Sequence, residues 1–111
     1  MEVKEPAVAY NKEKISIEAY LEMENASPEK NEYYKGEVFA MAGAKVPHNI
    51  ITRNLLVLLA QKLKGKSCQP FNSDQRIHVE SNTLFTYPDI SIICGDIITL
   101  NNDNYNVLNP S

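Results

Sequence analysis

In Tyr87-Pro88-Asp89-Ile90-Ser91-Ile92-Ile93-Cys94, one carboxylate precedes a run of mostly apolar residues. Proline has no backbone donor and is confined to strand starts, edges and bulges, so Pro88 predicts the opening of a strand with Asp89 at its first pleats. The residues after Asp89 are apolar on both faces, which is typical of an interior strand covered on both sides. A carboxylate there is costly unless it is solvated, paired or bound to a cation. We therefore interpret Asp89 as a candidate metal ligand.

The composition fits one small globular domain, because the 111 residues are 43% apolar and 23% charged. The net charge of -3 argues against a protein that coats nucleic acid through bulk electrostatics, but a nuclease needs an acidic site to hold cations. No charged and apolar leader opens the chain, and its longest apolar run, 55–60, is too short to cross a bilayer. We expect a cytoplasmic protein with no membrane partner. Cys68 and Cys94 show no paired spacing, which predicts reduced, buried thiols.

Local signals predict two helices and a hairpin. Residues 1–14 are polar and aperiodic, and we interpret them as a flexible arm before a domain at 15–111. Ser16 is a typical N-cap for a helix over 16–25. Lys35-Gly36 predicts a tight turn between two short strands. A long helix is expected from Pro47 to about residue 64, closed by glycine, and its expected buried stripe consists of Ile51, Leu55, Leu58 and Leu59.

The second half of the chain predicts further strands over 68–72 and 75–80 and a surface loop over 95–106. In the strand over 75–80, alternation places Ile77 and Val79 inward and Arg76, His78 and Glu80 toward water.

Three more residues are candidates for the site. Glu32 and Glu37 open the two arms of the hairpin, where opposed carboxylates can share a cation; solvated strand-end glutamates are the alternative. His48 lies on the expected inward face of the long helix at its amino end. An imidazole there can ligate a metal, orient water or accept a proton, although a lone histidine near an apolar stripe is more often a core residue.

Five segments resemble, in order and spacing, the Uma-type family of restriction endonucleases, a branch of the PD-(D/E)XK nuclease superfamily. They are residues 15–21, 32–38, 47–49, 71–74 and 87–90. The resemblance implies a restriction-endonuclease-like α/β fold of mixed α+β type, with a sheet flanked by helices. It also implies Mg²⁺ or Mn²⁺ as cofactor and DNA as partner, with Asp89, Glu37 and Glu32 as metal ligands and His48, Glu37 and Asp89 as catalytic residues.

Members of that family continue with a strand that carries a second metal carboxylate and with a lysine. The resemblance therefore implies a fold incomplete at the carboxyl end, and a truncated metal-dependent endonuclease that lacks part of the catalytic motif, which leaves open whether the chain is active by itself. The alternative is a noncatalytic remnant that acts as a binding or oligomerisation module. An uncovered strand edge and apolar surface would favour self-association, with a homodimer as the simplest form.

Overall fold

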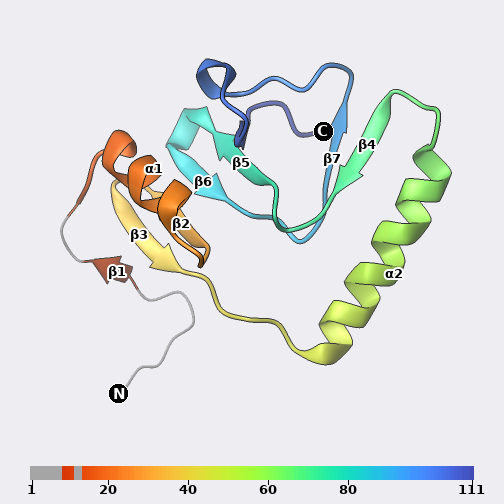
Figure 1. Ribbon diagram of the computed structural model, residues 1–111, viewed down its shortest axis with the longest axis horizontal. Coiled ribbons are helices and arrows are strands. Elements are labelled where there is room, and N and C mark those ends of the chain that lie inside the picture. Colours follow the sequence, from red (N-terminus) through yellow and green to blue (C-terminus); the bar gives the residue numbers. More distant parts are fainter. Residues whose placement is uncertain (1–8, 12–13) are drawn as a thin grey trace. The chain divides into compact units, whose positions relative to one another are not determined.

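The computed structural model describes residues 9–11 and 14–111, which form a mixed α+β protein of two compact units (Figure 1). The first unit comprises residues up to Gly43 together with Val79–Thr86, and the second comprises Ala44–His78 and Tyr87–Ser111. The mixed α+β class predicted from the sequence is confirmed. Within the arm predicted over 1–14, residues 1–8 and 12–13 lie outside the described residues.

The first unit is built on a sheet of four antiparallel strands in the order β1-β3-β2-β6. Its elements are β1 (Ala9–Asn11), α1 (Ile17–Ala26), β2 (Asn31–Tyr34), β3 (Glu37–Ala40), the 3-10 turn η1 (Glu80–Asn82) and β6 (Leu84–Thr86). No local pattern predicts β1, which pairs antiparallel with β3.

The predicted start of α1 and the hairpin turn are confirmed. The Ser16 side chain accepts a hydrogen bond from the backbone N–H of Ala19, as an N-cap does. Between β2 and β3, both Lys35 (φ 49°) and Gly36 (φ 92°) are left-handed, which is the two-residue turn that matches the twist of a hairpin.

Tyr20 of α1 lies at the centre of the core of the first unit. Its side chain is fully buried, and its ring lies 4.9 Å from that of Tyr33 and 5.3 Å from that of Phe85. The Tyr20 hydroxyl donates to the carbonyl of Asn31 at 2.6 Å. The buried Glu24 carboxylate accepts from the backbone N–H of Asn31 at 2.7 Å. These contacts join α1 to the start of β2.

The second unit consists of one long helix and two separate strand pairs (Figure 1). Its elements are α2 (Val46–Leu63), β4 (Cys68–Phe71), β5 (Arg76–Val79), β7 (Ser91–Cys94), the 3-10 turn η2 (Leu100–Asn102) and β8 (Asn106–Val107). The last residue of β5, Val79, belongs to the first unit. Strands β4 and β7 pair antiparallel, and β5 and β8 pair parallel. Helix α2 packs beside β4. Among the described residues, no helix is both long and apolar enough to cross a membrane.

The expected buried stripe of α2 is wrong at three of its four positions, and only Leu59 lies on the face that packs. Ile51, Leu55 and Leu58 are exposed by 67%, 45% and 48%, and the half-buried face instead consists of Thr52, Leu56, Leu59 and Leu63. The helix carries apolar residues on all sides, so periodicity alone could not single out the face that packs. The predicted end of the helix is confirmed, because Leu63 is its last residue and Gly65 follows with φ 76°.

The strand predicted from Pro88 begins later, at Ser91, and it is not an interior strand. One edge of β7 pairs with β4. On the other edge, β7 has a single isolated bridge, between Ile93 and Pro110. The prediction that Arg76 and His78 face water is also wrong, because both are 5% exposed. Both faces of β5 are covered. Alternation of polar and apolar residues along a strand predicts which residues are buried only when one face of the strand is open to solvent.

The prediction of two reduced thiols is wrong as well. Cys68 and Cys94 are direct partners in the β4–β7 register, their Cα atoms are 3.9 Å apart, and they form a disulfide. The antiparallel pairing creates this proximity, and the 26-residue separation in the sequence carries no signal for it.

Candidate functional site

Asp89 lies in the segment that leads into β7, two residues before the strand begins. Its side chain is 64% exposed. Tyr87, two residues before Asp89, is buried, and the guanidinium carbon of Arg76 lies 5.8 Å from the centre of the Tyr87 ring. This cation–π contact fixes the segment to β5. Asp89 is therefore an accessible carboxylate on an anchored segment.

His48 lies in the first turn of α2, and its Nε2 atom is 3.1 Å from Oδ2 of Asp89. Its side chain is 45% exposed, so the expectation of an inward-facing histidine is wrong. The first turn of α2 contains no acidic residue, and the N-cap residue Lys45 makes no side-chain hydrogen bond to the helix. The positive end of a helix favours a nearby anion, and Asp89 supplies one.

The contact between His48 and Asp89 is better suited to chemistry than to stability. Exposed ion pairs stabilise a fold by only about 0–1 kcal/mol. When Nε2 donates to Asp89, the carboxylate fixes the tautomer and orientation of the ring and leaves Nδ1 with a lone pair. Such an imidazole can orient a water molecule or accept a proton from it.

Glu32 and Glu37 belong to the first unit, so we treat them as a separate pair. In the hairpin register Glu32 faces Phe39 and Glu37 faces Tyr34, so the two glutamates are diagonal neighbours rather than opposed residues. Diagonal residues on one face are about 7–8 Å apart. Glu32 already accepts a hydrogen bond from the Thr86 hydroxyl.

The donor atoms at Asp89 and His48 fit a hard divalent cation only in part. Within the described residues, no group of three or more His, Cys, Asp or Glu side chains could hold a metal ion. Mg²⁺, however, commonly binds proteins through one or two carboxylates, keeps several waters and takes further oxygens from a substrate phosphate. Asp89, whose side chain is 64% exposed, matches that kind of open site.

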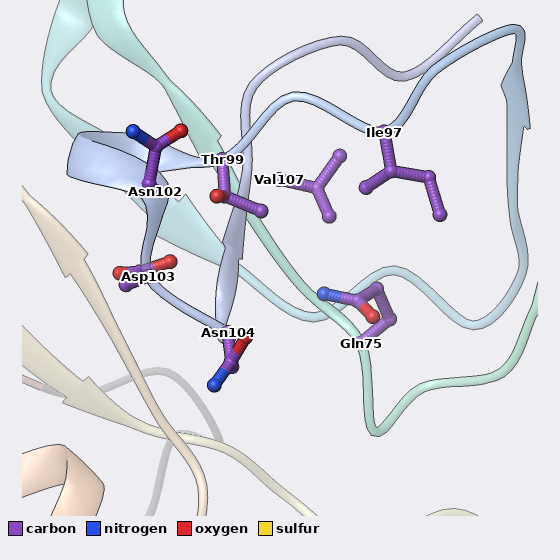
Figure 2. A pocket seen from close by; sticks show the side chains of 7 residues that line it. All are labelled: Gln75, Ile97, Thr99, Asn102, Asp103, Asn104 and Val107. Carbon is purple, nitrogen blue, oxygen red and sulfur yellow. The ribbon is translucent and has the colours of Figure 1, made fainter.

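A separate cavity of about 410 Å³ lies in the second unit, and Figure 2 shows the side chains around it. The lining residues are Gln75, Ile97, Thr99, Asn102, Asp103, Asn104 and Val107. None of the site residues predicted from the sequence lines this cavity. Its walls offer mainly neutral amide and hydroxyl groups and one carboxylate.

The carboxylate of Asp103 accepts hydrogen bonds within the turn that precedes β8. Its Oδ1 atom accepts hydrogen bonds from the backbone N–H groups of Tyr105 at 3.0 Å and Asn106 at 2.9 Å. Burial alone would raise the pKa of Asp103, but these hydrogen bonds, the Asn106 side chain and the charge of Arg76 lower that pKa below its ordinary value. We infer that Asp103 stabilises the turn and is not a ligand-binding residue. Sequence reasoning placed this segment in a surface loop and missed the role of its aspartate.

Comparison with known proteins gives one family and two curated relatives. The family model that matches residues 17–110 is Uma2, described as "Putative restriction endonuclease". The chain is similar to the uncharacterized protein slr1290 of Synechocystis sp., with 37% identity over 73% of this chain and 43% of the relative. It is also similar to the uncharacterized protein sll1609 of the same organism, with 34% identity over 87% of this chain and 55% of the relative. The chain thus spans about half the length of these relatives. No solved structure matches it.

Proposed function

Because the chain belongs to the Uma2 family of restriction endonucleases, we propose that it takes part in metal-dependent hydrolysis of phosphodiester bonds in DNA. The observation that carries this proposal is the 3.1 Å contact between His48 and Asp89. It joins an accessible carboxylate to a group that can accept a proton, and both residues fall within the matched region.

In the proposed site, Asp89 would hold Mg²⁺ or Mn²⁺. A cation of this kind lowers the pKa of bound water and neutralises charge on the phosphate. Asp89 has two carboxylate oxygens, so it could hold a cation without losing the contact between its Oδ2 atom and His48. His48 then orients the attacking water and accepts its proton at Nδ1.

Metal binding is the direct test of this proposal. Titration of Mn²⁺ into the folded chain should give weak binding that Asp89→Ala abolishes. The matched control is Asp96→Ala, which removes another exposed carboxylate of the second unit and should leave the affinity unchanged. Equal affinity in the Asp89→Ala variant would remove Asp89 from the metal site.

A noncatalytic binding or oligomerisation module is the second candidate. It is favoured by α2, which has no buried residue along its length, because large exposed apolar surfaces usually mark interaction sites. The two candidates differ in their response to metal. A pure binding module would show no Mn²⁺ affinity that depends on Asp89, whereas the nuclease proposal requires it.

A further inference from the structure

Helix α2 exposes apolar side chains on two faces beyond the one that packs beside β4. Its large apolar residues that remain more than 40% exposed are Val46, Ile50, Ile51, Leu55, Val57 and Leu58. A helix that is apolar all round is normally covered on every side. Exposed apolar surface of this extent on one element therefore indicates a docking surface.

One of these faces has the spacing of a helix-pairing seam. His48, Ile51, Leu55, Leu58 and Lys62 follow one another at alternating intervals of three and four residues, which is the spacing that lines up side chains between two packed helices. We call these five residues the α2 seam. Its apolar centre is exposed, its amino end carries the contact with Asp89, and its carboxyl end carries Lys62 in the last turn.

We propose that a second copy of this chain covers the α2 seam in an antiparallel, two-fold arrangement. Centred on Leu55, this arrangement places Leu55 against Leu55, Ile51 against Leu58, and Lys62 against His48. Two-fold dimers are the commonest oligomers, and each contact in them occurs twice. Formation of the dimer therefore covers the α2 seam of both copies at once.

Charge selects the antiparallel orientation. In a parallel pair, Lys62 would lie beside Lys62 of the partner subunit, and Asp89 beside its own counterpart, so like charges would meet at both ends. In the antiparallel pair, Lys62 of the partner subunit approaches the exposed carboxylate of Asp89. Complementary charges of this kind fix the register of an interface.

The second copy then contributes a group to the site. The ammonium of Lys62 from the partner subunit supplies three hydrogen-bond donors next to Asp89 and His48. A cation in that place can stabilise negative charge on a phosphoryl oxygen. This role rests on the proposed nuclease function, whereas the dimer itself does not.

Sedimentation equilibrium of the chain at micromolar concentration tests the dimer without metal or nucleic acid. We expect a dimer, and we expect Leu58→Lys to raise its dissociation constant by about 10- to 100-fold, because the lost burial of a half-exposed leucine counts twice across a two-fold axis. The matched control is Val57→Lys. Val57 is exposed by 51% against 48% for Leu58 but lies on the other exposed face of α2, so its substitution should leave the dimer intact. A wild-type monomer, or equal effects of the two substitutions, would overturn the proposal.

A charge exchange tests the register. Lys62→Glu and Asp89→Lys should each weaken the dimer by up to about 30-fold, because an exposed ion pair worth up to about fivefold is lost twice across the two-fold axis, and the two substitutions together should restore it. Failure of the double variant to recover would refute the antiparallel register. A monomer that binds vesicles of anionic phospholipid through Leu58 would assign the seam to a lipid surface instead and would also overturn the proposal. Loss of Mn²⁺ binding with an intact dimer would contradict the proposed function alone.

Discussion

Removal of the disulfide between Cys68 and Cys94 should lower the free energy of unfolding by several kcal/mol. The bond closes a segment of 26 residues, and the loss of unfolded-chain entropy from a loop of this length stabilises the folded state by about 3.5 kcal/mol. The stabilisation concerns the β4–β7 ribbon, which is only four residue pairs long. We therefore expect the second unit to depend strongly on this bond.

Urea unfolding followed by circular dichroism measures the effect on three samples: the oxidised chain, the chain treated with a phosphine reductant, and the Cys68→Ser/Cys94→Ser variant. For a chain with a urea slope of about 1–3 kcal/mol per molar, the midpoint should fall by about 1–3 M in the last two samples. The reductant should not change the double variant, which controls for effects other than thiol chemistry. Two titratable thiols in the air-oxidised chain, or an unchanged midpoint in the double variant, would contradict a stabilising disulfide between Cys68 and Cys94.

Three further substitutions test the packing of the two units. Tyr20→Phe removes the donor that lies 2.6 Å from the Asn31 carbonyl and should lower the free energy of unfolding by about 1–2 kcal/mol in urea, since a buried acceptor loses its partner. Asp103 has a pKa below its ordinary value of 3.8, so its ionised form stabilises the fold above that pH and the stabilisation is lost as the pH falls through the lowered folded-state pKa. The destabilisation caused by Asp103→Asn should accordingly shrink when urea unfolding is repeated in acid; a difference that stays constant with pH would contradict the assignment. Gly36→Ala forces a side chain onto a residue with φ 92° and should lower stability by about 1 kcal/mol, measured by thermal denaturation, whereas an unchanged melting temperature would count against the left-handed turn.

The parts of the fold that were predictable depend on residues close in the sequence. Ser16 caps a helix that begins one residue later, and Lys35-Gly36 forms the turn between two adjacent strands. Gly65 takes up a left-handed conformation just after α2 ends. Each signal acts within one turn of the chain, so the surrounding tertiary structure does not have to be known.

The wrong predictions all depend on which segments meet. The packed face of α2 is set by its contact with β4, and an all-round apolar helix gives no internal indication of that face. The disulfide follows from the register that places Cys68 opposite Cys94. The burial of His78 follows from cover on both sides of β5. Neither the composition nor the local periodicity of the sequence predicts these contacts.

For the candidate site, the sequence predicted the residues but not their environment. Asp89 was expected on a covered interior strand, and His48 on the buried face of a helix; instead both are largely exposed and touch each other. A carboxylate covered on both faces would be closed to a cation and to a phosphodiester, whereas a carboxylate just before β7 is open to both. The exposure that contradicts the predicted strand therefore strengthens the case for a reaction at Asp89. It also leaves the amino end of α2 accessible to the second helix of the proposed dimer.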